Sequence, residues 1–333
     1  MYSDHSDFYG DDSDLEGELP RKAKSKTTIA PPLVSSFEAL QAFKNKLGEA
    51  IICAIDLETV DNHHGTELQK MSEIGIAVYD PREASKTPSN AIPHASETKH
   101  SVSNDLLMEI AKSIMAYHFL KDDWKGETEI TCKAFWHKKK PHIARPYHCV
   151  FALSTIMSSS QCIESLKVIL QNLTSQNLTA EERQSGHQRQ VRVVFWDSGL
   201  EDKVFRQANI HLSELGHDIE TWDLQAWWPF KARFSNGKNR GLARGEVAFE
   251  CLGVVGAGNE TILHNATNDA VAQLLAFQRM MVIGEPEWKT WFDDRIDFEP
   301  ISFAWLDPKI YQGNIRRAPV RQRYQPRRAN GRH

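Results

Sequence analysis

The chain has 333 residues, of which 41% are hydrophobic and 25% are charged, with a formal net charge of −4. The hydrophobic fraction is sufficient for a folded core, but no apolar run fits a secretory leader or a membrane span. Five cysteines without paired spacing favour reduced thiols, so we expect an intracellular protein, in the nucleus or the cytoplasm, that is not secreted.

The N-terminal segment is first acidic and then basic. Residues 1–20 hold seven Asp and Glu residues and almost no apolar ones, and residues 21–26 hold four Lys and Arg residues. A segment of this composition cannot bury enough apolar surface to fold. We therefore predict a disordered tail over residues 1–34 and a single α/β domain over residues 35–305.

The first strand is predicted at residues 50–55, after a helix at 36–47. Six apolar residues in a row, too few for a helix, suit a strand that is buried on both faces. Asp56 and Glu58 follow its C-terminal end, and side chains two residues apart on a strand point to the same side. Two carboxylates this close favour a divalent cation between them, and oxygen ligands favour Mg²⁺ or Mn²⁺.

The middle of the chain predicts alternating helices and strands from the spacing of its apolar residues. A second strand at 73–79 is expected to run antiparallel to the first. The elements expected after it are a surface insertion at 82–100, a helix at 106–120, a third strand at 148–153, a helix at 161–170, a loop at 174–190, a strand with its exit turn at 192–198 and a last strand at 219–224. These predictions give five strands in one mixed sheet with flanking helices.

Another candidate acidic residue follows the strand at 192–198. Asp202 lies four residues beyond it, near the first turn of a helix that is indicated by the spacing of Leu200, Val204 and Phe205. Asp197, at the end of the strand, is the alternative candidate.

The last motif opens a helix near residue 265. Asn265 is a suitable N-cap, and Asp269 falls in the first turn, where it would be fixed on a rigid element. His264 precedes the helix, where we expect its side chain to be able to move. An imidazole with an ordinary pKa near 6.5 suits a general base at neutral pH.

The C-terminal segment, residues 306–333, is rich in Arg, with Pro and Gly among them, so we predict a disordered tail. Arginines in such a tail can hold a phosphate backbone. The candidates for contact with nucleic acid are Arg316, Arg317, Arg321, Arg323, Arg327 and Arg328.

The order Asp-x-Glu, then Asp, then His-x-x-x-x-Asp resembles the DEDDh exonucleases, whose domain has an RNase H-like fold. The resemblance extends over about residues 45 to 285. The residues at 264–270 are similar to a His-Asn-Ala-Gly-Asn-Asp-Ala motif of a fungal branch of largely uncharacterised RNase H-like proteins, one of which is linked by name to messenger RNA export. Two departures stand out: Thr267 replaces the Gly of that motif, and Trp196-Asp197-Ser198 replaces the Gly-His-Asn that usually precedes the second-motif Asp.

The resemblance implies a 3′→5′ exonuclease that acts on RNA or single-stranded DNA. Asp56, Glu58, Asp202 and Asp269 would hold two Mg²⁺ or Mn²⁺ ions, roughly 3.5–4 Å apart. His264 would take the proton from the attacking water, and the product would be a nucleoside 5′-monophosphate.

Each motif alone is also typical of an ordinary solvated strand end or helix cap, and only their joint order favours a nuclease. The two departures leave a second hypothesis open, that of a catalytically weak or inactive nucleic-acid-binding or adaptor protein in messenger RNA metabolism or export. A scaffold that binds no nucleic acid would leave both the carboxylates and the Arg-rich segment unexplained. The sequence does not distinguish RNA from DNA.

Overall fold

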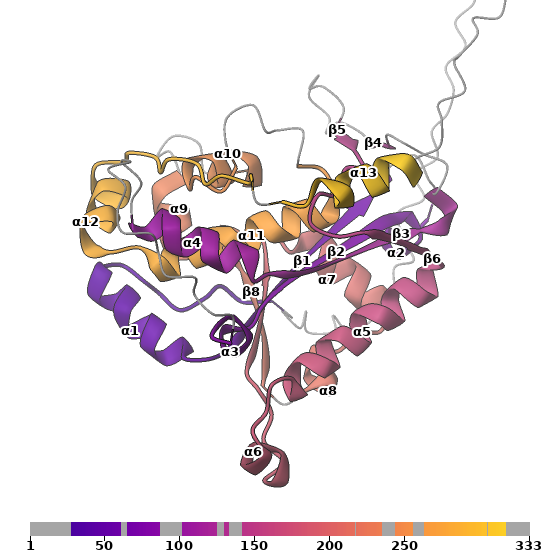
Figure 1. Ribbon diagram of the computed structural model, residues 1–333. Coiled ribbons are helices and arrows are strands. Elements are labelled where there is room, and N and C mark those ends of the chain that lie inside the picture. The colour runs from indigo at the N-terminus through magenta and orange to yellow at the C-terminus, as the bar shows by residue number, and fades with distance from the viewer. Residues whose placement is uncertain are drawn as a thin grey trace, which may run out of the picture.

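A mixed six-stranded sheet lies at the centre of the computed structural model (Figure 1). The structure describes residues 28–60, 65–86, 102–124, 130–132, 142–216, 218–234, 244–255, 263–304 and 306–317. The strands of the sheet are β1 (Ile51–Thr59), β2 (Met71–Tyr79), β3 (Met115–Lys121), β6 (Ser154–Met157), β7 (Val191–Phe195) and β8 (Ile219–Asp223). Their order is β6-β3-β2-β1-β7-β8, in which β2 runs antiparallel to β1 and to β3 and the other pairs are parallel. A separate antiparallel pair consists of β4 (Ile130–Cys132) and β5 (His142–Ala144).

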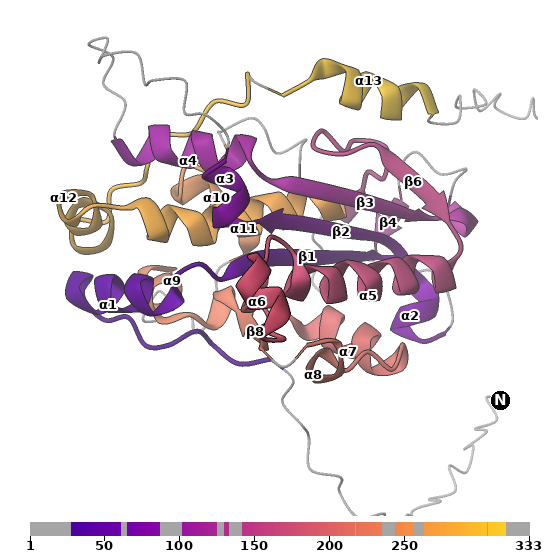
Figure 2. The ribbon, with the colours of Figure 1, turned by 60° about the horizontal axis from the view of Figure 1, so that its bottom comes forward.

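Helices cover both faces of the sheet (Figures 1 and 2). The helices are α1 (Phe37–Leu47), α2 (Glu67–Lys70), α3 (Pro81–Ala84), α4 (Val102–Lys112), α5 (Ser159–Ser175), α6 (Ala180–Gln184), α7 (Gly199–Gln207), α8 (Leu212–Leu215), α9 (Trp228–Phe234), α10 (Gly245–Cys251), α11 (Ala266–Val282), α12 (Glu285–Trp288) and α13 (Pro308–Arg317). Helices α1, α4 and α11 pack on one face, and α5 and α7 pack on the other. None of the helices in these described ranges combines the length and the apolar character that a membrane span needs.

The strand β1 shows why the sheet separates two cores. Ile52 and Ala54 pack in the core on the α11 side, whereas Ile51, Cys53 and Ile55 pack in the core on the α5 side. This alternation is the period of two that a strand imposes on its side chains. It continues into the polar end of β1 and sets which residues face α11.

The RNase H-like α/β architecture expected from the sequence is confirmed, but with six strands in the sheet instead of five. The residues predicted as one helix at 106–120 form the end of α4 and then β3. The strand predicted at 148–153 is also wrong, because the strand β6 begins at Ser154. The predicted loop at 174–190 contains α6. The first two errors concern short apolar runs, in which the periods of helix and strand are not distinguishable from sequence.

Both predicted tails are wrong over their inner parts. At the N-terminal side, Ile29 forms a parallel bridge with Trp222 of β8, and Val34 is fully buried. At the C-terminal side, α13 docks through Asn314, which is 0% exposed. Its side-chain amide donates to the carbonyls of Cys149 and Ala152. Residues 1–27 and 318–333 lie outside the described residues, so the prediction of disorder there stays a prediction.

Candidate functional site

The carboxylates of β1 face helix α11. Because Ile52 and Ala54 pack on the α11 side of the sheet, the residues that follow them at steps of two, Asp56 and Glu58, point to the same side. Glu58 is buried, and Asp56 is only partly buried. The end of β1 therefore presents two acids to α11 while leaving one of them open to solvent.

The first turn of α11 lies directly against the neighbouring strand β2. Gly75 pairs with Asp56 across the antiparallel ladder, and a Cβ at Gly75 would lie 2.0 Å from the carbonyl carbon of Ala266. Only glycine allows this close approach of helix and strand. The hydroxyl of Thr267 donates to the carbonyl of Tyr117 on β3 at 2.9 Å, so this departure from the related motif is used in docking the helix.

Two asparagines of the same motif hold the start of α11. Asn265 is the N-cap, as predicted, and its side chain accepts from the backbone N–H of Asn268. The side chain of Asn268 accepts from the N–H of Val150 and donates to the carbonyl of His148. The segment predicted as a strand at 148–153 is thus fixed by contacts with α11.

Four carboxylates, from Asp56, Glu58, Glu201 and Asp269, form what we call the acid cluster. Ligand atoms of Glu58, Asp269 and His264 lie within 4.8 Å of one another. Burial, and then the charge of Asp269, raises the pKa of Asp56 well above its usual value. Burial and the neighbouring acids likewise raise the pKa of Glu58 and of Asp269. Groups with such pKa values are costly to ionise together unless a positive charge joins them.

Glu201 is the member of the cluster that the sequence analysis missed. It lies in the first turn of α7 and is 5% exposed. Its Oε1 accepts from the backbone N–H of Leu57, which lies between Asp56 and Glu58 on β1. Burial raises the pKa of Glu201 to about 8. Its charge also contributes to the raised pKa values of Asp56 and Glu58.

The two candidates named from the sequence for this position have other contacts. Asp202 lies in the first turn of α7, as predicted, but its carboxylate accepts from the hydroxyl of Thr28 at 2.6 Å. Asp197 is exposed, with a φ of 65°, and its N–H donates to the carboxylate of Asp223 at 3.2 Å. Successive residues of a helix are 100° apart, and of these two acids it is Glu201 whose carboxylate contacts β1. The assignment of Asp202 as a ligand stays a prediction.

His264 is held through its backbone next to the acid cluster. It has a left-handed φ of 67°, and its N–H donates to the carboxylate of Asp269 at 3.1 Å. Its carbonyl accepts from the N–H of Arg145 at 2.8 Å. The ring Nε2 lies 3.3 Å from Glu246 Oε1, and the side chain is 24% exposed. The backbone is therefore anchored, while the ring keeps contact with solvent.

Behind the acid cluster, a buried polar chain supports the start of α11. Glu73, which pairs with Glu58 across the sheet, accepts from the side chain of Asn265 at 3.0 Å. Its Oε2 also lies 3.0 Å from His118 Nε2, and His118 Nδ1 lies 2.8 Å from the hydroxyl of Ser154. This chain joins β2, β3 and β6 to the residue next to His264.

Unpaired buried oxygens around the cluster fit a bound cation. Among the described residues, Glu73 Oε1, Glu201 Oε2 and Gln273 Oε1 are buried without a hydrogen-bond partner. Unpaired acceptors of this kind are costly unless a donor or a positive charge satisfies them. Carboxylate and amide oxygens are ligands that Mg²⁺ and Mn²⁺ prefer. The residues present therefore fit a hard divalent cation.

The remaining site predictions concern the Arg-rich segment. Arg316 and Arg317 lie in the last turn of α13, and Arg316 is exposed. Arg321, Arg323, Arg327 and Arg328 lie outside the described residues. Contact of these six residues with nucleic acid stays a prediction.

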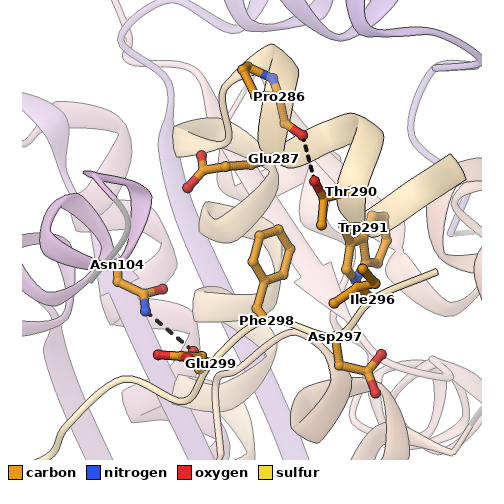
Figure 3. Close-up of a pocket in the computed structure, with 9 residues that line it drawn as sticks. All are labelled: Asn104, Pro286, Glu287, Thr290, Trp291, Ile296, Asp297, Phe298 and Glu299. Atoms are coloured by element: carbon orange, nitrogen blue, oxygen red, sulfur yellow. Dashed lines mark hydrogen bonds between the residues drawn. The ribbon is translucent and has the colours of Figure 1, made fainter. Parts of the chain in front are cut away.

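A pocket of about 240 Å³ lies away from the acid cluster, where the chain continues from α11 into α12 (Figure 3). Among the described residues, its lining contains no member of the acid cluster. The lining residues are Asn104, Pro286, Glu287, Thr290, Trp291, Ile296, Asp297, Phe298 and Glu299. The carboxylates thus gather at one end of α11 and the pocket lies near the other.

One of the comparisons with known proteins identifies the family of this chain. The model of the family described as DNA polymerase III subunit epsilon-like, C-terminal domain, of DEDDh type, matches residues 51–280. No curated protein matches the sequence significantly. One matching solved structure is that of exonuclease I, with 10% identity, 79% of this chain covered and a TM-score of 0.29. The match spans 43% of the exonuclease I chain, and a likeness this distant does not bear on activity.

Proposed function

The chain belongs to the DEDDh exonuclease family, and from that premise we propose that it is a metal-dependent 3′→5′ exonuclease acting on RNA or single-stranded DNA. The main supporting observation is the convergence of Glu58, Asp269 and His264 within 4.8 Å, with Asp56 and Glu201 beside them. This set contains both ligands for divalent cations and a candidate base. It comes from a strand and two helices that are far apart in the sequence.

The acid cluster is proposed to hold the cations. Asp56, Glu58 and Asp269 would be ligands, with Glu201 in the place that the sequence analysis gave to Asp202. Burial and mutual repulsion raise the pKa values of these groups, and a divalent cation bound between them would relieve the repulsion. Two Mg²⁺ or Mn²⁺ ions supply an activated water and stabilise the leaving oxygen in enzymes of this chemistry.

His264 is proposed as the general base that takes the proton of the attacking water. Its ring is in contact with solvent at the edge of the cluster and has Glu246 at 3.3 Å from Nε2. A carboxylate at this distance stabilises the imidazolium that forms when the proton is taken. The Asp269 carboxylate, which accepts from the His264 N–H, keeps the residue beside the ligands.

A gel assay with end-labelled oligonucleotides tests the proposal. RNA and DNA single strands, labelled at the 5′ end or blocked at the 3′ end, are incubated with Mg²⁺, Mn²⁺ or EDTA. We expect stepwise shortening from the 3′ end that requires the cation and is prevented by a 3′ block. The matched control is Asp269→Asn, prepared in the same way to exclude a contaminating nuclease. Degradation that persists in this variant or in EDTA would contradict the proposal.

The alternative, a nucleic-acid-binding or adaptor protein without catalysis, rests on the altered second motif. Asp197 stands where the related proteins have His, and it is exposed. The motif's similarity to the fungal branch, one member of which is linked by name to messenger RNA export, suggests the same alternative. The gel assay separates the exonuclease from the adaptor, because an adaptor would leave the single strands at full length under all three conditions.

The Arg-rich segment is proposed to contact the substrate backbone. Deletion of residues 318–333, which removes Arg321, Arg323, Arg327 and Arg328, should weaken binding of long single strands. Each lost phosphate contact should reduce the slope of log affinity against log salt by about 0.7. The single-turnover rate on a saturating short oligomer should not change, since the acid cluster is intact. An unchanged salt slope would assign the segment to another role.

A further inference from the structure

Helix α11 places a buried amide one turn beyond Asp269. Gln273 is 2% exposed, and its Nε2 donates to Asp56 Oδ1 at 2.6 Å. Residues four apart on a helix lie on the same face, so Asp269 and Gln273 both reach the end of β1. One side of α11 thus offers first a carboxylate and then a neutral amide to the same strand.

The other polar atom of this amide is unpaired. Gln273 Oε1 is buried without a partner in the described part of the chain. An amide oxygen can accept two hydrogen bonds, and leaving a buried acceptor empty is unfavourable. Because Oε1 and Nε2 belong to one amide group, the unpaired oxygen lies beside the Asp56 carboxylate.

The contact between Gln273 Nε2 and Asp56 Oδ1 fixes the orientation of that carboxylate, because it ties one of the two oxygens to a buried side chain on a rigid helix.

We propose that Gln273 is a positioning residue for the cation site, an inference that rests on the proposed metal-dependent function. Its Nε2 holds one oxygen of Asp56 and would so orient this carboxylate as a ligand. Its Oε1, which is buried without a partner in the described part of the chain, would accept a hydrogen bond from a water carried by a bound cation. Mg²⁺ keeps several of its waters in protein sites, and those waters need acceptors. One atom of the Gln273 amide would thus hold the Asp56 carboxylate, and the other would contact the water around the cation.

The test compares two glutamines of the same helix. Gln273→Met keeps the length of the side chain and removes both polar atoms, and Gln278→Met makes the same change at a residue that is also buried, at 3% exposed. Mn²⁺ binding to each full-length protein is measured by calorimetry without nucleic acid, beside thermal unfolding in EDTA. We expect Gln273→Met to bind Mn²⁺ roughly 10–100-fold more weakly, the usual effect of losing a group that orients a ligand. Gln278→Met should bind Mn²⁺ as the wild type does.

Other results would overturn the inference. If Gln273→Met binds Mn²⁺ within about twofold of the wild type, or if both variants are weakened equally, Gln273 only packs α11 against β1. Should Gln273→Met not fold, Gln273→Leu replaces it, since it also removes both polar atoms of the side chain. Weaker Mn²⁺ binding by Gln273→Leu would support the inference, and equal or tighter binding would refute it. A wild type that binds no Mn²⁺ would refute the proposed function as well. If the wild type binds Mn²⁺ and cleaves, a negative result for the Gln273 variants refutes only the role of Gln273.

Discussion

The two ends of helix α11 bury opposite kinds of unpaired polar atoms. Near its N-terminal end the unpaired atoms are oxygens, and toward its C-terminal end they are N–H groups. Among the described residues, the oxygens are Glu73 Oε1, Glu201 Oε2 and Gln273 Oε1, and the N–H groups are Arg233 Nε, Arg279 Nη2 and Trp291 Nε1. Both kinds are unfavourable in isolation, so the difference lies in what surrounds them.

The N–H groups lie in a stack of aromatic rings and guanidinium groups next to the pocket of Figure 3. The Arg279 guanidinium lies 4.7 Å from the centre of the Phe298 ring, and Phe298 stacks on Trp291 with centroids 6.1 Å apart. The guanidinium carbon of Arg233 also lies over the Trp291 ring, 5.9 Å from its centre. Attraction between the two guanidinium cations and the ring faces compensates the missing acceptors of Arg233 and Arg279, whereas Trp291 Nε1–H stays an unpaired donor.

The oxygens have no such compensation, because their neighbours are other carboxylates. Burial, and then the acids around them, raise the pKa values of Asp56, Glu58 and Asp269. A divalent cation would relieve this end of α11, because it would neutralise several of these carboxylates at once. Unpaired buried atoms therefore indicate a ligand site only where the charges around them repel one another.

The largest effect is expected from removing one ligand charge. Asp56→Asn should lower the cleavage rate by about 10³-fold or more, because each cation contributes several kcal/mol to stabilising the transition state. The same change should raise the unfolding temperature in EDTA, since one repelling carboxylate is gone. Rate and thermal unfolding are measured on the same preparation. A lower unfolding temperature of the variant in EDTA would show that repulsion among the carboxylates of the acid cluster does not destabilise the protein.

The second prediction separates the base from the ligands. His264→Ala should lower turnover by roughly 10²–10⁴-fold while Mn²⁺ affinity stays close to that of the wild type. The reason is that the proposed ligands are the carboxylates of the acid cluster, whereas the His264 ring is in contact with solvent beside them. Turnover is compared with Mn²⁺ calorimetry. A matching loss of affinity would assign the ring as a ligand instead of a base.

Much of the acid cluster was predictable from sequence because its parts obey local periods. Asp56 and Glu58 share a face through the strand period of two, and Asn265 fixes where α11 begins and hence the position of Asp269. The distance between these elements was not predictable. It depends on Gly75, whose missing side chain lets α11 approach β2.

Glu201 could have been found from the phase of its helix. Val204 and Phe205 are the buried apolar residues of α7, and the residue three and four positions before them is Glu201, on the same face. The apolar stripe expected from the sequence also included Leu200, and Asp202 was preferred because it lies four residues beyond the strand. Helix α13 left no comparable signal, since it docks through the polar residue Asn314.

The third prediction compares the two adjacent acids of α7. Glu201→Gln should weaken Mn²⁺ binding and cleavage by roughly 10–100-fold, as expected for a group that contacts or orients the cation. Asp202→Asn should change them by about twofold or less, because its carboxylate contacts Thr28. Both variants change one oxygen to an amide in the same helical turn, so each is the control for the other. The reverse order of effects would restore Asp202 as the ligand.

The fourth prediction concerns pH. The pKa of Glu201 is raised from 4.5 to about 8 in the folded protein, so between these values the folded state binds more protons than the unfolded state. Its contribution to stability is fully present below pH 4.5 and is lost as pH rises toward 8. The unfolding temperature in EDTA should therefore fall over this range, and less steeply in Glu201→Gln. Saturating Mn²⁺ should flatten the profile, and equal slopes in both proteins would exclude Glu201 as the cause.

The smallest effect is expected at the opposite end of α11. Trp291→Phe removes the unpaired Nε1–H and keeps an aromatic ring in the stack with Phe298. The lost packing of the larger ring lowers stability, and the removal of an unpaired buried donor raises it by about 1–3 kcal/mol. These contributions nearly cancel, so the free energy of unfolding should change by about 1 kcal/mol or less. Mn²⁺ affinity and cleavage should stay unchanged, because the stack belongs to the other end of the helix. Denaturant unfolding beside Mn²⁺ calorimetry measures both, and a loss of Mn²⁺ affinity here would mean that the two ends of α11 are coupled and that the contrast between them is not one of local charge.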